Sequence, residues 1–221
     1  MGFNIAIDGP AGAGKSTIAR RVAKELSFIY VDTGAMYRAM ALYLLQNQVD
    51  GADTEKVAAV CKHADISIEY KDGQQMVLLN GENVNAHLRS EAVGNMASLS
   101  SANPAVRSHL LELQRNLARS SDVVMDGRDI GTTVLPEAQV KIFLTASADT
   151  RAQRRYIELT EKGIACDINE IRADIIARDT RDMNREASPL RQAEDAVLVD
   201  SSHMGIEEVV QAILTIYREK A

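Results

Sequence analysis

The sequence contains little of several residue types that mark particular classes of protein. It has no tryptophan, four prolines and two cysteines in 221 residues. Cys61 and Cys166 are isolated and lack the CxxC spacing of redox and zinc sites, so we expect packed or surface thiols and no metal cage. No apolar run approaches the ~18 residues that a membrane-spanning helix needs. These absences argue against a disulfide scaffold, a structural zinc protein and a membrane protein.

Positive charge is also scarce. Lysine and arginine number 25 against 31 acidic residues, a net charge of -6. Nucleic-acid binding without sequence preference needs a basic surface, so we expect no nucleic-acid partner. Eight arginines nevertheless fall between Arg151 and Arg191, and such a local concentration is typical of a site for small anions. The chain starts without the basic and apolar segments of a signal peptide, which predicts a soluble cytoplasmic protein.

Short apolar runs alternate with longer stretches that are compatible with helices. This alternation predicts an α/β fold with a doubly wound, parallel, five-stranded sheet and helices on both faces. The apolar runs, which we expect to form buried strands, are Phe3–Ile7, Phe28–Val31, Val123–Met125, Val140–Leu144 and Ala196–Val199. Near the end of the chain, apolar residues at helical spacing predict a helix with one core-facing side: Ile206, Val209, Val210, Ile213, Leu214 and Tyr217.

One region departs from this alternation. Ile66–Tyr70 and Met76–Leu79 flank the segment Lys71-Asp72-Gly73, and a second turn follows at Asn80-Gly81. This pattern predicts an antiparallel hairpin or small meander, which we interpret as an insertion at about 60–95.

A glycine-rich loop connects the first predicted strand to a helix that we expect to begin near Lys15. Its sequence is Gly9-Pro10-Ala11-Gly12-Ala13-Gly14-Lys15-Ser16, followed by Thr17. In such a loop, backbone N–H groups surround phosphates, the lysine reaches the β- and γ-phosphates, and the hydroxyl can coordinate Mg²⁺. The loop therefore predicts a P-loop fold that binds a nucleoside triphosphate with Mg²⁺, with Ser16 as the metal ligand.

GTPases share this loop but read guanine with an Asn-Lys-x-Asp segment and sense the γ-phosphate with Asp-x-x-Gly. Neither pattern occurs here. Two alternatives remain open on the motif alone. One is a kinase for another nucleoside monophosphate or a small metabolite, and the other is a nucleotide-binding regulatory protein without turnover.

Polar segments follow the second and third predicted strands, where a doubly wound fold opens toward its ligand. Asp32-Thr33-Gly34 with Arg38 suggests a site for an acceptor phosphate. In Asp126-Gly127-Arg128-Asp129-Ile130-Gly131, glycines on both sides of an Arg-Asp pair suggest that backbone approaches a ligand. Later, Arg178, Asp182 and Arg185 have the spacing of one helix face, which is equally compatible with a solvated ladder of ion pairs.

Together these segments closely resemble bacterial cytidylate kinases, a group of nucleoside monophosphate kinases. The resemblance runs in order along nearly the whole chain and includes Lys141–Leu144, Arg151–Arg155 and Arg178–Arg185. This chain has Thr33 where the family has serine. The resemblance implies a core formed by residues 1–59, 96–150 and 191–221, a monophosphate-binding insertion at 60–95, and a helical lid at 151–190.

The resemblance also implies a role for each site residue. The reaction would be transfer of the γ-phosphoryl group of ATP to CMP or dCMP, by a protein we expect to be a monomer. Catalysis would rest on Lys15, Arg128, Arg185 and Arg155, and the ATP site would add Arg151 and Arg154 to the loop from Gly9 to Thr17. The acceptor site would use Arg38, Arg128 and Arg185 at the phosphate, Arg178 and Asp182 at the sugar, and Ser98, Arg107 and Asp129 at the cytosine, with Thr33 as a further substrate-binding residue.

Overall fold

The computed structural model describes residues 2–71 and 73–221. The chain divides into two compact units. We call Ile29–Val123 the hairpin unit, and Phe3–Phe28 with Val124–Ala221 the phosphate-loop unit. The boundaries predicted for the core, the insertion and the lid stay predictions.

The five predicted strands are all present and form one parallel sheet, which confirms the predicted fold class. They are β1 (Asn4–Asp8), β2 (Ile29–Asp32), β6 (Val123–Gly127), β7 (Val140–Thr145) and β8 (Val197–Asp200), in the order β2-β6-β1-β7-β8. Because β1 is central, the chain proceeds to one side of it and later to the other. This order places the switch point of the doubly wound sheet at the carboxyl end of β1, where the glycine-rich loop begins.

The edge strand β8 differs from the prediction in its burial. It pairs with β7 on one side, from Ile142↔Val197 to Thr145↔Asp200. Val197 and Leu198 are 36% and 55% exposed. The prediction of a fully buried strand was wrong here because an edge strand has a neighbour on one side only.

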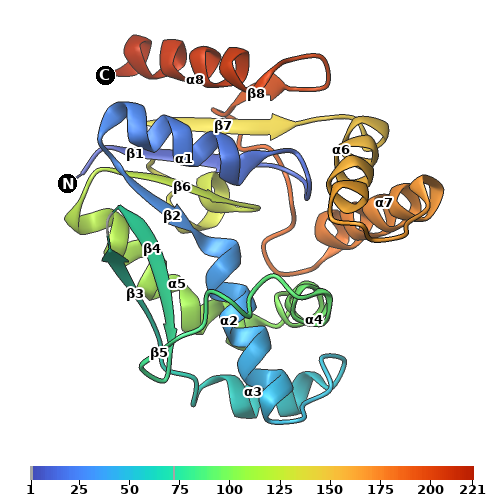
Figure 1. Cartoon of the computed structure of the whole chain (residues 1–221). Coiled ribbons are helices and arrows are strands. Elements are labelled where there is room, and N and C mark those ends of the chain that lie inside the picture. The colour runs from blue at the N-terminus through green and yellow to red at the C-terminus, as the bar shows by residue number, and fades with distance from the viewer. Residues whose placement is uncertain (1, 72) are drawn as a thin grey trace. The chain divides into compact units, whose positions relative to one another are not determined.

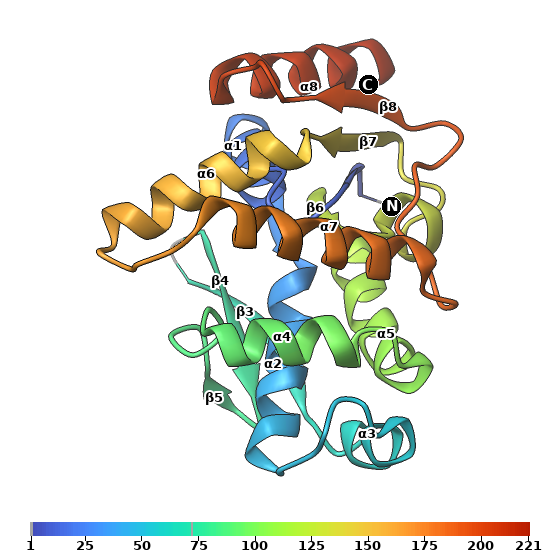
Figure 2. The same cartoon turned by 90° about the vertical axis from the view of Figure 1, so that its right-hand side faces the viewer.

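Four α-helices accompany the sheet within the phosphate-loop unit: α1 (Lys15–Leu26), α6 (Ala148–Glu161), α7 (Ile168–Asn184) and α8 (Ile206–Lys220). Helix α1 packs against α8, and α6 and α7 lie side by side as a helical pair (Figure 1 and Figure 2). The rings of Phe3, Phe28 and Tyr217 form a cluster with centroids 5.1–6.1 Å apart. In α8 the middle of the predicted apolar face is buried, whereas Ile206 at its start is half exposed and Tyr217 near its end is partly exposed.

The end of α7 corrects one expectation. The helix ends at Asn184, and Arg185 follows with extended backbone at φ -65° and ψ 141°. Arg185 therefore does not share a helix face with Arg178 and Asp182. Its side chain leaves the backbone in a direction that the helical spacing did not predict.

The hairpin unit contains the predicted antiparallel sheet. Strands β3 (Ile66–Lys71), β4 (Gln74–Leu79) and β5 (Glu82–Asn83) pair in that order, which confirms the small sheet, although Asp72 of the first predicted turn lies outside the described residues. At the second turn, Asn80 and Gly81 both have positive φ, as a two-residue hairpin turn requires. The helices of this unit are α2 (Thr33–Gln46), α3 (Thr54–Cys61), α4 (Glu91–Ser100) and α5 (Pro104–Ser120).

None of the helices described has the length and apolar character needed to cross a membrane.

Candidate active site

The glycine-rich loop depends on its glycines for backbone geometry. Gly12 and Gly14 have φ of 76° and 87°, a region that side chains disfavour. At Gly9 a Cβ atom would lie 1.9 Å from the carbonyl oxygen of Leu144 in β7. The loop therefore passes directly over the neighbouring strand and ends at Gly14, the residue before α1. The first N–H groups of α1 have no helical acceptor and carry partial positive charge.

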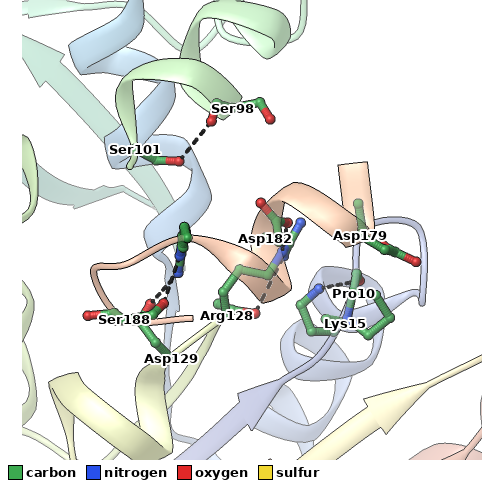
Figure 3. Close-up of polar contacts among 12 residues, drawn as sticks. Pro10, Lys15, Ser98, Ser101, Arg128, Asp129, Asp179, Asp182 and Ser188 are labelled. Carbon is green, nitrogen blue, oxygen red and sulfur yellow. Dashed lines mark hydrogen bonds and ion pairs between the residues drawn. The ribbon is translucent and has the colours of Figure 1, made fainter. Parts of the chain in front are cut away.

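Lys15 is the buried cation of this loop. Its Nζ donates a hydrogen bond to the carbonyl oxygen of Pro10 at 2.8 Å (Figure 3). The pKa of Lys15 is lowered to about 7, chiefly by burial and also by the positive charges of Arg128 and Arg178, while the negative charges of Asp126 and Asp8 act in the opposite direction. Two guanidinium groups thus lie close enough to lower the pKa of Lys15, and an anion bound beside Lys15 would favour its charged form.

Ser16 and Asp126 come together from distant parts of the sequence. The Ser16 hydroxyl donates to Oδ2 of Asp126 at 3.0 Å, at the end of β6. Both groups offer oxygen atoms, the ligands that Mg²⁺ prefers.

Two arginine–carboxylate pairs involve Arg128 and Asp129, the residues that follow β6, and both of these residues are labelled in Figure 3. Arg128 donates through Nε to Oδ2 of Asp182 on α7 at 3.0 Å. Arg185 donates through Nε to the carbonyl oxygen of Ser188 at 2.7 Å, and its Nη2 lies 3.6 Å from Oδ1 of Asp129. The side chains of Arg185 and Asp129 are 7% and 5% exposed, so this ion pair is largely shielded from solvent. Hydrogen bonds and ion pairs therefore hold both guanidinium groups in defined orientations.

Arg151 at the start of α6 is also buried, and protein groups surround it. Its Nη1 and Nη2 contact the two carboxylate oxygens of Asp179 at 3.1 and 2.6 Å. Nε donates to the carbonyl oxygen of Ala146 at 2.9 Å, and Nη1 to that of Ala11 in the glycine-rich loop at 3.0 Å. Arg151 thus links the loop to both α6 and α7.

The other two arginines of α6 have different surroundings. Arg154 donates to the hydroxyl and carbonyl oxygens of Ser201 at 3.3 and 2.7 Å. Arg155 is half exposed and pairs with Glu158 one turn along the helix at 2.8 Å. Of the three, Arg155 has its guanidinium group most accessible to a ligand.

In the hairpin unit, α2 begins at a predicted acceptor residue, Thr33, which is buried. Asp32 caps the helix, and its Oδ1 accepts from the N–H of Ala35 at 2.9 Å. A Cβ atom at Gly34 would lie 3.4 Å from Nη1 of Arg38 and 3.2 Å from Oδ1 of Asp32. The guanidinium group of Arg38 is therefore folded back over the first turn of α2.

Arg107 and Ser98 belong to neighbouring helices of the same unit. The guanidinium carbon of Arg107 lies 5.5 Å from the ring centroid of Tyr37, and its Nη1 donates to the carbonyl oxygen of Ser101 at 3.3 Å. The hydroxyl oxygen of Ser98 is buried and has no hydrogen-bond partner within the described part of the chain. A buried hydroxyl of this kind is rare unless a ligand or water completes its hydrogen bonding.

Comparison with known proteins decides the family. A family model described as cytidylate kinase matches residues 5–219. The chain belongs to the cytidylate kinase family.

Individual relatives are similar to this chain over nearly its whole length. A cytidylate kinase of Caldicellulosiruptor saccharolyticus is 50% identical over 215 residues, covering 97% of this chain and 95% of the relative. A cytidylate kinase of Carboxydothermus hydrogenoformans is 50% identical over 218 residues, covering 99% and 98%. Among solved structures, an uncharacterized protein from Eubacterium ventriosum aligns with a TM-score of 0.52 and 12% identity, covering 99% of each chain. This last likeness concerns the fold alone.

Each unit gathers its own part of the site residues predicted for a cytidylate kinase. The phosphate-loop unit holds the loop from Gly9 to Thr17, with Arg128, Asp129, Arg151, Arg154, Arg155, Arg178, Asp182 and Arg185. The hairpin unit holds Thr33, Arg38, Ser98 and Arg107. Their roles toward the nucleotides stay predictions.

Two carboxylates of the phosphate-loop unit were missed as site residues. Asp126 contacts Ser16, as described above, and Asp8 ends β1 immediately before the loop. Asp8 accepts hydrogen bonds from the N–H groups of Ile130 and Gly131, both at 2.7 Å. The sequence signal was a carboxylate at the end of a buried apolar strand, where a charge is costly unless it has partners.

The bonds to Asp8 also explain Gly131. A Cβ there would lie 3.4 Å from Oδ2 of Asp8 and 3.2 Å from Cδ of Lys141. We had interpreted the glycines around Arg128 and Asp129 as a sign of backbone approaching a ligand. At Gly131 the close neighbours are protein side chains, and the glycine allows Asp8 to hold the segment that follows Asp129.

Protonation of Asp8 should make stability depend on pH. The pKa of Asp8 is raised to about 7, chiefly by burial and also by the negative charge of Asp129, although the hydrogen bonds from the N–H groups of Gly131 and Ile130 lower it. Between about pH 4 and 7 the folded protein then binds a proton that the unfolded chain lacks, so Asp8 contributes less stability as pH rises toward 7. As pH rises through this window, the unfolding free energy of wild type should fall relative to that of Asp8→Asn by up to about 1.4 kcal/mol per pH unit.

Urea unfolding of wild type and Asp8→Asn at several pH values between 4.5 and 8 measures this difference. An Asp174→Asn variant, which changes an exposed carboxylate of α7, serves as the matched control and should follow the wild-type curve. Parallel curves for wild type and Asp8→Asn would show that Asp8 keeps an ordinary pKa.

Proposed function

We propose that this protein transfers the γ-phosphoryl group of ATP to CMP and dCMP, producing ADP with CDP or dCDP. The relatives named cytidylate kinase, about 50% identical over nearly the full chain, support this acceptor. We also propose that the protein is a monomer, that it is located in the cytoplasm and that it acts in pyrimidine nucleotide metabolism.

The grouping of cations around Lys15 is the observation that carries this proposal. Lys15 lies near Arg128 and Arg178, whose charges depress its pKa. The negative charges of Asp126 and Asp8 raise the pKa of Lys15 and partly offset this effect, and phosphates bound among the cations would favour the charged form of Lys15 further. Because a transferring phosphoryl group carries its charge on several oxygen atoms, fixed cations around it lower the barrier to transfer.

The residues present fit a magnesium ion that arrives with ATP. The Ser16 hydroxyl and the Asp126 carboxylate lie within hydrogen-bond distance of each other and would supply its protein ligands. In the described part of the chain, no group of three or more His, Cys, Asp or Glu residues could hold a metal alone. This suits Mg²⁺, which commonly takes one or two protein oxygens together with substrate phosphates. When bound, it neutralises charge on the β- and γ-phosphate oxygens.

The acceptor needs no general base in this proposal. The second pKa of a phosphate monoester is about 6, so its oxygen is largely unprotonated at neutral pH. The protein's task is to bring two polyanions together in line and to exclude water as a competing acceptor. We assign the donor phosphates to the loop with Lys15, and to Arg155 of the predicted lid.

The acceptor residues follow from the family resemblance. Arg38, Arg128 and Arg185 are proposed to bind the CMP phosphate, and Arg178 and Asp182 the sugar hydroxyl. Ser98, Arg107 and Asp129 are proposed to read the cytosine. The buried Ser98 hydroxyl without a hydrogen-bond partner among the described residues supports its assignment, since a base edge would complete its bonding. An Asp129 carboxylate accepts from the exocyclic amino group of cytosine, whereas uracil has a carbonyl at that position.

A panel of acceptors tests the proposal. With ATP and Mg²⁺, ADP release is measured for CMP, dCMP, UMP, AMP, GMP and shikimate, with an acceptor-free reaction as the control for ATP hydrolysis. We expect kcat/KM for CMP and dCMP to exceed every other acceptor by at least about tenfold, since a site built for hydrogen bonds rejects acceptors that leave its groups unpaired. An equal or higher value for any acceptor without cytosine would contradict the proposal.

A further inference from the structure

Two side chains of the small antiparallel sheet hold the end of β2. Tyr70 of β3 and Gln75 of β4 are direct partners in the ladder, so their side chains lie on the same face. The Tyr70 hydroxyl donates to the carbonyl oxygen of Tyr30 at 3.1 Å. The Gln75 amide accepts from the N–H of Asp32 at 2.8 Å and donates to the carbonyl oxygen of Asp32 at 3.1 Å. The Gln75 side chain thus pairs with the backbone of Asp32 as a neighbouring strand would.

The backbone around Gln75 is itself fixed. Asn85, which follows β5, donates through Nδ2 to the carbonyl oxygen of Gln75 at 2.9 Å. Its Oδ1 accepts from the N–H of Val77 at 2.8 Å. Asn85 therefore binds the backbone of β4 at Gln75 and at Val77, which fixes the strand segment from which the Gln75 side chain extends.

The residue that Gln75 holds also caps α2. Oδ1 of Asp32 accepts from the Ala35 N–H, and Arg38 folds back so that its guanidinium lies beside the same turn. A rotation of the Asp32 backbone would move this carboxylate and with it the first turn of α2. Arg38 has a long, flexible side chain, so its orientation depends on how firmly that turn is held.

We propose that Gln75 is a positioning residue for the acceptor. Together with Tyr70, it fixes Asp32, the first turn of α2 and so the guanidinium of Arg38, which is assigned to the CMP phosphate. This inference rests on the proposed function for what Arg38 binds, and on the geometry of the hairpin unit for how Arg38 is held. The small sheet then acts on acceptor binding through side-chain bonds to β2, without contact between Gln75 and the acceptor.

The adjacent residue offers a matched control. Gln74 has the same side chain on the same strand and points to the opposite face, where it is exposed. Among the described residues its side chain has no hydrogen-bond partner. A Gln74→Ala change therefore reproduces the loss of a glutamine from β4 and leaves Asp32 untouched.

The experiment measures kcat and KM for CMP at saturating ATP, and KM for ATP at saturating CMP, in wild type, Gln75→Ala, Gln75→Glu and Gln74→Ala. Gln75→Ala removes two hydrogen bonds, so we expect KM for CMP to rise about 3- to 10-fold, with KM for ATP within about twofold of wild type. Gln75→Glu keeps the acceptor for the Asp32 N–H, so its KM for CMP should lie between the values of wild type and Gln75→Ala. The kcat and both KM values of Gln74→Ala should match those of wild type.

Amide hydrogen exchange of the free proteins provides a readout that is independent of turnover. In Gln75→Ala, the amides of residues 32–38 should exchange at least about threefold faster, because the first turn of α2 opens more often. The exchange rates of the amides in α5 should not change.

The outcomes separate the two proposals. Any one of three results would overturn the role of Gln75. These are an unchanged KM for CMP, equal rises of KM for CMP and KM for ATP, and unchanged amide exchange over residues 32–38. A wild-type protein that does not phosphorylate CMP would overturn the proposed function, and the exchange measurement would still decide whether Gln75 holds α2.

Discussion

Replacing Lys15 with methionine is expected to lower kcat for phosphoryl transfer by about a thousandfold or more. Lys15 is the cation nearest the start of α1, and its Nζ turns back to the Pro10 carbonyl within the loop. Methionine has a similar length and fills the space without charge. The expected loss reflects charge stabilisation that the side chain supplies to the β- and γ-phosphates as the bond between them breaks. A coupled assay of ADP release measures it.

Stability distinguishes this effect from misfolding. Because burial lowers the pKa of Lys15 to about 7, the folded protein holds its charge at a cost. Lys15→Met should therefore unfold at a urea concentration equal to or above that of wild type. Lys24→Met, at an exposed position in the last turn of the same helix, is the matched control and should keep wild-type activity. Retention of more than about a tenth of the wild-type kcat by Lys15→Met would rule out the mechanism proposed above.

Replacing Asp129 with alanine is expected to lower kcat/KM for CMP by about a hundredfold. The dissociation constant for ATP should stay within about threefold of wild type, because Asp129 is assigned to the base of the acceptor. Kinetics with CMP and calorimetric binding of ATP measure the two quantities. Equal losses of both would indicate that the variant is misfolded or that Asp129 has no part in reading the base.

A second substitution isolates base recognition from stability. Asp129 lies 3.6 Å from Arg185, and both are buried, so any neutral residue at 129 leaves that arginine without its carboxylate. Asp129→Asn shares this defect with Asp129→Ala but offers an amide donor that suits the uracil carbonyl. We expect the ratio of kcat/KM for CMP to that for UMP to fall at least about tenfold in Asp129→Asn. A ratio unchanged from wild type would mean that Asp129 supports the fold only.

Features of the fold that depend on neighbouring residues in the chain could be predicted from the sequence. The apolar run Val140–Leu144 became β7, and Asn80-Gly81 became the turn between β4 and β5. The loop before Lys15 adopts positive φ at its glycines, as its motif requires. Strand burial, turn chemistry and glycine spacing are local properties, so the sequence contains them directly.

Contacts between distant residues could not be predicted in this way. Asp8 lies 122 and 123 positions from the N–H groups it accepts, and Gln75 lies 43 positions from Asp32. The buried guanidinium of Arg151 contacts Asp179 and the Ala11 carbonyl, 28 and 140 positions away, while its role toward ATP stays a prediction. A hydrogen bond depends on where two groups meet in space, and nothing in the local sequence specifies that.

The sequence by itself therefore determined the fold class, the phosphate loop and the family resemblance, because these follow from local periodicity and from motifs whose residue types the chemistry requires. The tertiary structure decided which carboxylate contacts each of three polar or charged side chains: Asp126 for Ser16, Asp182 for Arg128, and Asp129 for Arg185. It also revealed the bonds from Gln75 to the start of α2. Those partners matter because a buried charge or amide is stable only where the folded chain brings its counterpart within about 3 to 4 Å.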